Sequence, residues 1–291
     1  MITISVTNAA WVWDVDPVAF RIGDAEYRYY SLCFVALLLT IFFCMRWVYR
    51  REGEPVERAA KFMLGAVVGI LAGARLGHVF FYNWPYYRDA PLKIVEFWNG
   101  GLSSHGATFA VLLVCLANAH ARRTPFRVTL DRIPFIAPLG AWVRLGNFFN
   151  GEIVGQPTDV PWAVVFPNHS ALPRHPSQLY EVLLNLSVFA AVLWIDRAYR
   201  RRGVERPLGL LFGIYCILYF GGRFLLEFLK EYQTLESGLR MGQWLSIPMV
   251  LLGVGMVVAA QWGPWRHQHA KHYLREAGLI DRDEETPDQK S

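Results

Sequence analysis

The sequence contains few charged residues for its length. Lys, Arg, Asp and Glu make up 18% of its 291 residues, whereas they make up about 25% of a typical soluble domain. The mean hydropathy is positive, at +0.23. So few charges cannot cover the surface of a soluble protein, and this apolar composition also excludes disorder, collagen and a coiled coil. We therefore expect apolar runs long enough to cross a bilayer.

The sequence also lacks the patterns of disulfide frameworks and metal sites. Four cysteines stand singly in apolar stretches, without a Cys-x-x-Cys pair, at Cys33, Cys44, Cys115 and Cys216. No His or carboxylate spacing completes a zinc site. There is no His-Glu-x-x-His motif, no Gly-x-Ser-x-Gly motif and no aspartate cluster for magnesium inside a span. We therefore expect no metal, no cofactor and no nucleophilic serine, and the cysteines are expected to act as small apolar residues.

Apolar runs that approach bilayer length occur seven times. A spanning helix needs about 20 mostly apolar residues, and the matching windows are residues 30–48, 62–83, 103–121, 132–150, 178–196, 207–227 and 242–263. The sequence therefore predicts an all-α membrane protein, a polytopic bundle of about seven transmembrane helices. We expect an integral membrane domain over residues 1–265, with periplasmic loops at about 83–104 and 151–176, and a polar cytoplasmic tail over residues 266–291.

The basic residues divide unevenly between the two sides of such a bundle. Nineteen Lys and Arg residues lie in alternate connections and the tail, and seven lie in the connections of the other side. Because Lys and Arg concentrate on the cytoplasmic side of membrane proteins, the N-terminus is expected outside and the C-terminus in the cytoplasm. The net charge of +5 and the pI near 9.1 then reflect topology and contact with anionic lipid, and we expect no nucleic-acid partner.

Three arginines remain at membrane depth: Arg75, Arg144 and Arg223. An arginine at the centre of a span costs about 2.5–3.5 kcal/mol on insertion scales, so each should face the bundle interior or a wet cavity. Two other interpretations stay open. Each arginine could reach the interface from near a span end, and Arg223 could be a structural partner of Glu227, four residues later on the same helical face.

Polar residues are densest around Arg144. Asn147 and Asn150 follow it at helical spacing, and Glu152 comes next, among several glycines. Helical geometry would place the guanidinium and the two amides along one side, where a planar guanidinium could bind two oxygens of a phosphate. A polar seam between packed helices is the alternative.

Two histidines lie on the predicted outer side. His105 is at the start of the third window, where its near-neutral pKa would suit proton transfer, although a lone interfacial histidine is the simpler interpretation. His175 precedes Pro176, which is typical of a helix start, so His175 is either a helix cap or a polar group at the edge of a site.

Several segments together resemble bacterial prolipoprotein diacylglyceryl transferases. Residues 143–155, Val-Arg-Leu-Gly-Asn-Phe-Phe-Asn-Gly-Glu-Ile-Val-Gly, are similar to the signature of this family. Further matching segments, in the expected order, are residues 73–77, 81–83, 100–106, 174–181 and 241–243. The resemblance runs from about residue 30 to residue 256. Two positions depart from the family pattern: Val143 replaces a glycine before the signature arginine, and Ala107 replaces a glycine after the histidine.

The resemblance implies an enzyme of the bacterial inner membrane that needs no cofactor. It would transfer diacylglyceryl from phosphatidylglycerol to the lipobox cysteine of a preprolipoprotein signal peptide, forming a thioether and releasing glycerol-1-phosphate. The implied catalytic residues are His105, expected to act as a base, and Arg144 and Arg223, expected to stabilise the departing phosphate. The implied substrate-binding residues are Tyr30, Arg75, Asn147, Asn150, Glu152, His175, Gln178, Tyr180, Glu227 and Gln243. The alternative is a non-catalytic transporter of lipid or anionic solutes.

Overall fold

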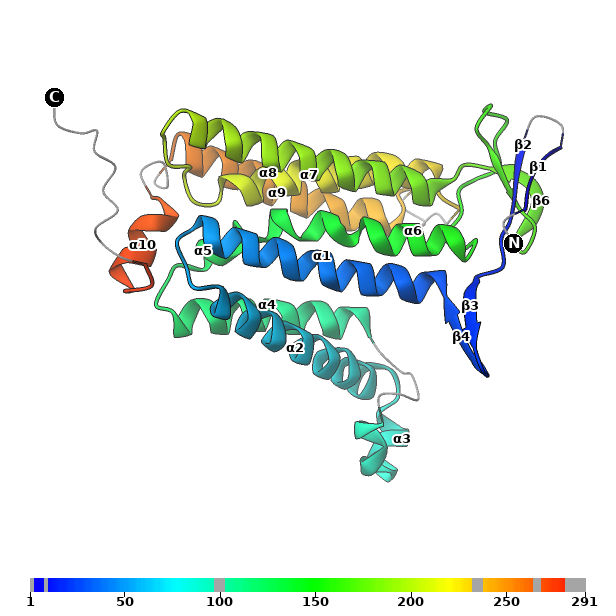
Figure 1. Cartoon of the computed structure of the whole chain (residues 1–291), viewed down its shortest axis with the longest axis horizontal. Coiled ribbons are helices and arrows are strands. Elements are labelled where there is room, and N and C mark those ends of the chain that lie inside the picture. Colours follow the sequence, from blue (N-terminus) through cyan, green and yellow to red (C-terminus); the bar gives the residue numbers. More distant parts are fainter. Residues whose placement is uncertain (1–2, 8–9, 97–102, 232–237, 264–267, 281–291) are drawn as a thin grey trace. The chain divides into compact units, whose positions relative to one another are not determined.

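The computed structural model describes residues 3–7, 10–96, 103–231, 238–263 and 268–280 (Figure 1). This part of the chain is mostly helical. Its α-helices are α1 (Tyr29–Arg51), α2 (Val56–Tyr82), α3 (Trp84–Asp89), α4 (Ser104–Ala121), α5 (Phe126–Leu130), α6 (Ala141–Phe149), α7 (Ser177–Arg201), α8 (Leu210–Leu226), α9 (Met241–Gln261) and α10 (Ala270–Glu276).

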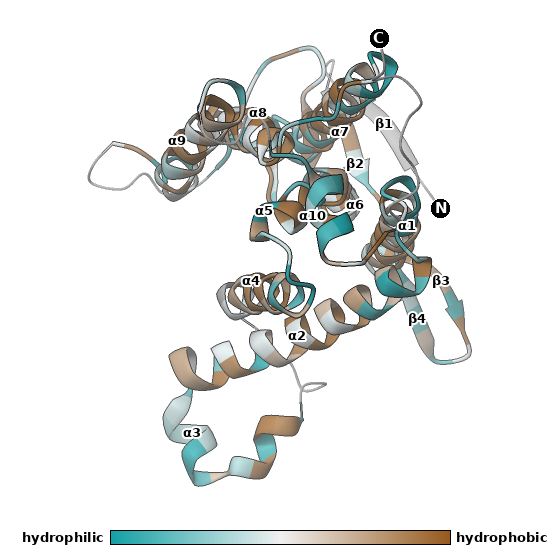
Figure 2. Ribbon diagram, turned by 90° about the vertical axis from the view of Figure 1, so that its left-hand side faces the viewer, coloured by the Kyte–Doolittle hydropathy of each residue, from teal (hydrophilic) through white to brown (hydrophobic). Residues whose placement is uncertain are grey.

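Five of these helices, α1, α2, α7, α8 and α9, are long and apolar enough to cross a membrane, counted over the described residues. A further helix, α4, covers the third predicted window with 18 residues. Apolar residues cover much of α8 and α9, whereas α10 is largely hydrophilic (Figure 2). These helices confirm the prediction of an all-α polytopic membrane protein.

The fourth window, residues 132–150, is not one spanning helix, and this part of the prediction is wrong. Two 3-10 turns, η3 (Ile133–Phe135) and η4 (Ala137–Gly140), come first, and α6 follows with only nine residues. Each turn contains a proline, Pro134 or Pro138, which has no backbone N–H to donate within a helix. At 1.5 Å per residue, α6 is roughly 13 Å long, less than half of the bilayer core.

The chain divides into two compact units. Unit 1 comprises residues 1–44 and 131–268, and unit 2 comprises residues 45–130 and 269–291. In unit 1, α8 packs against both α7 and α9, and α7 also packs against α6. Helices α8 and α9 approach closely at two glycines, because a Cβ atom on Gly253 would lie 2.7 Å from the carbonyl oxygen of Gly213.

Unit 1 also contains short β-strands that the sequence analysis did not predict. Strands β1 (Thr3–Thr7), β2 (Ala10–Asp14), β5 (Val164–Phe166) and β6 (Ser170–Arg174) form one sheet in the order β1-β2-β5-β6. Strands β2 and β5 are parallel, with Trp11 opposite Val164. A hairpin of β3 (Val18–Ile22) and β4 (Ala25–Arg28) leads directly into α1.

The sheet shares a hydrophobic core with the end of α6. The buried side chains of this core are Phe148, Val154, Val164 and Phe166, and Trp13 packs against them. The ring centroids of Trp13 and Phe148 are 4.3 Å apart. The sheet therefore anchors the segment that carries the family-like signature.

In unit 2, α2 and α4 pack together through glycines. Gly65, Gly69, Gly73 and Gly77 recur every fourth residue of α2 and so lie on one face. A Cβ atom on Gly106 of α4 would lie 2.2 Å from the carbonyl oxygen of Gly73 and 2.9 Å from the Cα atom of Gly77. Only glycine allows this close approach of two backbones.

Candidate active site

Arg144 lies in the middle of α6 and is held by residues of two helices. Its Nε atom forms an ion pair with the carboxylate of Glu181 on α7, and its Nη1 atom donates a hydrogen bond to Oδ1 of Asn147 at 3.3 Å. The Arg144 side chain remains 23% exposed. It is thus oriented by protein contacts and still accessible to a ligand.

The two asparagines that follow Arg144 converge on one carboxylate. The side-chain amides of Asn147 and Asn150 both donate to Oε1 of Glu152, at 2.8 and 3.2 Å. A continuous chain of contacts therefore runs from Glu181 through Arg144 and Asn147 to Glu152. The predicted row of donors along α6 is confirmed for Arg144 and Asn147.

The backbone after α6 turns sharply so that Glu152 can meet these amides. Gly151 has φ +64° and Ile153 has φ +57°. The left-handed region is strained for a β-branched residue such as isoleucine, and it persists only where surrounding contacts hold it. Gln178 provides one such contact, because its Nε2 atom donates to the carbonyl oxygen of Glu152 at 2.7 Å. The hydroxyl of Ser177 provides another, to the carbonyl of Ile153 at 2.8 Å.

Gln178 was predicted to bind substrate. The structure places its side chain, which is only 1% exposed, beneath the signature loop as a support for the backbone. Gly155 fixes the same loop from the other side, since a Cβ atom there would lie 2.6 Å from the carbonyl oxygen of His175.

A second group of charges lies behind Arg144. The Glu181 carboxylate, which binds Arg144, also forms an ion pair with the ammonium of Lys230, and this ammonium lies 3.7 Å from Glu227. Arg223, near the end of α8, hydrogen-bonds Tyr219 and interacts with both Glu181 and Glu227. The direct pairing of Arg223 with Glu227 stays a prediction, and both residues lie within a larger network that reaches Arg144.

Lys230 was not among the predicted site residues. Its side chain is 1% exposed, and a buried ammonium is tolerable only when it is paired with opposite charge. The sequence feature that could have indicated Lys230 is its position three residues after Glu227, about one helical turn along the chain. In this network three cations, Arg144, Arg223 and Lys230, are gathered around the carboxylates of Glu181 and Glu227.

Glu227 lies against the start of α9, which Gln243 caps. Oε1 of Gln243 accepts from the backbone N–H of Arg240 at 2.9 Å, and the Arg240 guanidinium donates to the carbonyl oxygens of Glu227 and Lys230. A Cβ atom on Gly242 would lie 2.5 Å from the carboxyl carbon of Glu227. Gln243, predicted to bind substrate, thus caps α9 and helps to position the end of α8.

Tyr30 packs directly against the signature helix. A Cβ atom on Gly146 of α6 would lie 2.9 Å from the Tyr30 ring. The neighbouring Tyr29 stacks on Phe149, with ring centroids 4.5 Å apart. The start of α1 is therefore in contact with the helix that carries Arg144.

His175 and Tyr180 form a separate pair at the start of α7. Nδ1 of His175 lies 3.0 Å from the Tyr180 hydroxyl, which accepts a hydrogen bond from Nε1 of Trp162 at 2.7 Å. Burial lowers the pKa of His175 and so favours its neutral form, whose unprotonated nitrogen can accept a hydrogen bond from a hydroxyl. The helix-cap interpretation is wrong, because the cap of α7 is Pro176 and no side chain binds there.

The remaining two predicted residues, Arg75 and His105, belong to unit 2. Arg75 is 6% exposed, and its guanidinium donates to the carbonyl oxygens of Ile94 at 2.8 Å, Lys93 at 2.6 Å and Glu96 at 3.1 Å. Arg75 thus holds the 3-10 turn η1 (Pro91–Val95) onto α2.

His105 lies in the first turn of α4, and its side chain is outside the described atoms, as are residues 97–102. The backbone around it is well held. Ser103 donates its N–H to the carbonyl of Ala74 at 2.8 Å, and the Ser103 hydroxyl accepts from the N–H of Gly106 at 3.3 Å. The N-terminus of α4 is therefore fixed on the glycine face of α2.

Within unit 1 the site presents cations and amides rather than a nucleophile or a metal. Where the chain is described, no three His, Cys, Asp or Glu side chains are grouped to hold a metal ion. Two guanidinium groups and amide donors suit the binding of a phosphate and the stabilisation of negative charge that develops on it.

Comparison with known proteins agrees with this arrangement. Residues 17–259 match the family described as prolipoprotein diacylglyceryl transferase. The phosphatidylglycerol--prolipoprotein diacylglyceryl transferase of Bordetella parapertussis is 41% identical over 264 residues, covering 87% of this chain and 98% of that protein. The enzyme of the same name from Geobacter sulfurreducens is 39% identical over 251 residues, covering 84% and 95% of the two chains. This chain belongs to the prolipoprotein diacylglyceryl transferase family.

Proposed function

We propose that this protein transfers the sn-1,2-diacylglyceryl group of phosphatidylglycerol to the lipobox cysteine of preprolipoproteins, the first step of lipoprotein maturation. The observation that carries the proposal is the family match over residues 17–259, which includes the joined network of Arg144, Asn147 and Glu152. The names of the relatives from Geobacter and Bordetella state the same two substrates.

In the proposed reaction one bond forms and one breaks at a glycerol carbon. The sulfur of the lipobox cysteine attacks the carbon that carries the phosphate, forming a C–S thioether bond. The C–O bond to the phosphate breaks, and its electron pair leaves on glycerol-1-phosphate. The thiol proton goes to a base, since only the thiolate is a good nucleophile.

The network of unit 1 supports the departure of the phosphate. Negative charge grows on the leaving group, and fixed cations aimed at such charge lower the barrier. Arg144 is oriented by Glu181 and Asn147. Arg223 also interacts electrostatically with Glu181. Glu152 and its two amide partners would bind the hydroxyls of the glycerol headgroup, because carboxylates accept and amides both donate and accept.

His105 is the proposed base. Its backbone lies at the N-terminus of α4, next to the close contact of Gly106 with α2. Histidine is the side chain that most often takes up and releases protons in catalysis near neutral pH. The other binding assignments, to Tyr30, Arg75, His175, Gln178, Tyr180, Glu227 and Gln243, remain part of this proposal.

We further propose that the chain is a multi-pass protein of the bacterial inner membrane, with its N-terminus outside and its tail in the cytoplasm. The division of nineteen to seven basic residues between alternate connections supports this orientation. It requires seven crossings, of which η3, η4 and α6 together would make the fourth. The sheet β1-β2-β5-β6 and the signature loop would then face the periplasm, where the lipobox peptide is modified.

The experiment is a transfer assay on the purified full chain. The protein is incubated in vesicles of phosphatidylglycerol with a synthetic lipobox peptide, and the peptide mass is measured. A mass increase equal to one diacylglyceryl group is expected, together with release of glycerol-1-phosphate. Vesicles of phosphatidylcholine and a peptide with Ser in place of the lipobox Cys serve as controls. An unmodified peptide would contradict the proposal and favour a lipid or anion transporter.

A further inference from the structure

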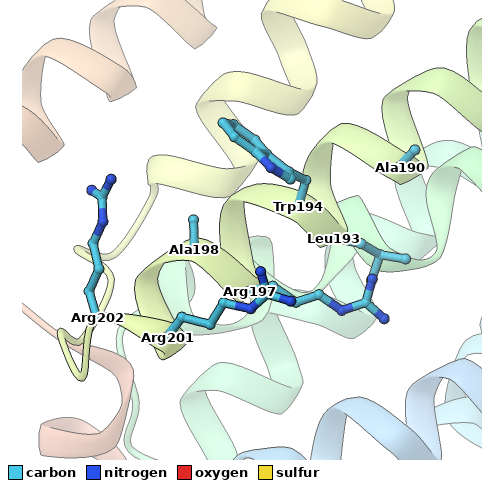
Figure 3. Close-up of a pocket in the computed structure, with 7 residues that line it drawn as sticks. All are labelled: Ala190, Leu193, Trp194, Arg197, Ala198, Arg201 and Arg202. Atoms are coloured by element: carbon cyan, nitrogen blue, oxygen red, sulfur yellow. The ribbon is translucent and has the colours of Figure 1, made fainter.

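A pocket lies at the C-terminal end of α7, far from the network around Arg144. It has a volume of about 460 Å³ and is lined by Ala190, Leu193, Trp194, Arg197, Ala198, Arg201 and Arg202 (Figure 3). Sixteen residues separate Glu181 from Arg197 on the same helix, which corresponds to roughly 24 Å along its axis. The pocket is therefore separate from the candidate active site.

The lining residues form one stripe along α7 that changes from apolar to basic toward the C-terminal end of the helix. Their spacing of three and four residues places them on one helical face. The stripe begins with Ala190 and Leu193, continues with Trp194, which is 71% exposed, and ends in arginines. This order follows the profile of a bilayer, in which the core is apolar, tryptophan lies at the interface and arginine reaches the phosphates.

The positive charge in the pocket is not neutralised by nearby acids. Arg200 and Arg206 pair with Asp196, at 3.2 and 2.6 Å. Among the described residues, by contrast, no ion pair involves the three pocket arginines, Arg197, Arg201 and Arg202, and no acidic residue lines the pocket. A site that combines three guanidinium groups with an apolar flank is complementary to an anion that carries a hydrocarbon part.

We propose that this pocket binds the headgroup of an anionic membrane phospholipid. The phosphate would contact the guanidinium groups of Arg197 and Arg201, and the glycerol and the first part of an acyl chain would lie along Trp194 and Leu193. The charge selects an anionic lipid over a zwitterionic one, and the apolar flank selects a lipid over a soluble phosphate. This lipid is bound without being consumed, because the pocket contains neither a base nor the network around Arg144.

The test measures lipid binding and not transfer. The full chain in detergent is titrated with phosphatidylglycerol or phosphatidylcholine, and the bound lipids are counted by native mass spectrometry. The variant is R197Q/R201Q/R202Q. The matched control is R50Q/K61Q/R123Q, which removes the same charge from three exposed residues outside the pocket.

The wild-type protein should bind one more phosphatidylglycerol than the pocket variant. At about 1 kcal/mol for each basic residue, the lost site should weaken roughly a hundredfold. R197Q and R201Q alone should each weaken it roughly fivefold, and the control should match the wild type. Equal lipid counts for pocket variant and wild type, an equal loss in the control, or equal filling by phosphatidylcholine would overturn the proposal. The result of the transfer assay does not affect this test, because lipid binding is counted without any transfer.

Discussion

At the scale of single residues, the Arg144 guanidinium is both held by protein contacts and accessible to a ligand. One side of it is bound to Glu181 and Asn147, and part of it stays exposed. Arg144→Lys keeps the charge but loses the planar fork that can bind two oxygens at once. We expect turnover to fall by one or more powers of ten, about 1.4 kcal/mol each, with little change in melting temperature.

Turnover and thermal stability should be measured on the same detergent-purified sample of this variant. Arg223→Lys should behave likewise if both arginines stabilise the departing charge. Near-normal turnover of Arg144→Lys, or a lower melting temperature without a loss of turnover, would show that Arg144 only stabilises the helix packing.

The base assignment of His105 makes a prediction about pH. A cysteine thiol with a pKa near 8.5 is only a few per cent ionised at pH 7. His105→Ala should therefore abolish transfer at neutral pH and recover part of it as the pH rises toward about 9, because the peptide thiol then ionises without help. A pH series of the transfer assay measures this. Activity that stays absent at high pH would make His105 a binding or orienting residue.

The buried Lys230 links the two carboxylates behind Arg144. Lys230→Met keeps the length of the side chain and leaves Glu181 and Glu227 with less compensating charge in a buried setting, which typically costs about 3–5 kcal/mol. We expect a clear drop in melting temperature together with reduced turnover. Substitution of the exposed Lys61 by methionine is the control. An unchanged melting temperature would show that the ion pairs do not stabilise the fold.

At the scale of elements, the packing of α2 on α4 depends on glycine. A Cβ atom on Gly73 would lie 2.3 Å from the Cβ atom of Ala110 and 2.6 Å from the carbonyl oxygen of Gly106, whereas one on Gly255 of α9 would meet nothing within 4 Å. Alanine favours a helix by about 1 kcal/mol over glycine, but overpacking typically costs about 1–3 kcal/mol.

Gly73→Ala should therefore lower the melting temperature, and Gly255→Ala should leave it unchanged or raise it. Because Gly106 adjoins His105, Gly73→Ala should also reduce transfer. The melting temperatures of the two variants and the wild type are compared in the same detergent. Equal melting temperatures would show that α2 and α4 adjust to the added methyl group.

At the scale of the whole molecule, the distribution of basic residues predicts the orientation in the membrane. Leu92 and Val204 are both strongly exposed and lie in connections predicted on opposite sides. In intact cells, Leu92→Cys should react with a membrane-impermeant maleimide, and Val204→Cys should react only after the inner membrane is opened. The native cysteines are buried or partly buried, and the labelling of the wild-type protein gives the background level of reaction. Reaction of both positions from one side would contradict the topology.

The amino-acid sequence by itself determined the class of the protein and the signature that carries Arg144, but not the whole charged network, because Glu181 and Lys230 were not among the predicted site residues. The low charge, the bilayer-length runs and the signature around Arg144 are local or compositional properties, so they can be read without coordinates. The contact between Arg144 and Asn147 was also predictable, because residues three apart on a helix are neighbours.

Only the tertiary structure decided what these side chains contact. Lys230 and Glu181 are 49 positions apart, and the support of the signature loop by Gln178 crosses 26 positions. No helical spacing encodes such contacts. The strands of the four-stranded sheet were missed because β2 pairs with β5, a segment about 150 residues later. The broken fourth span was missed because hydropathy does not register the missing N–H of Pro134 and Pro138. Local periodicity sets the elements, but long-range packing assigns each polar group its partner.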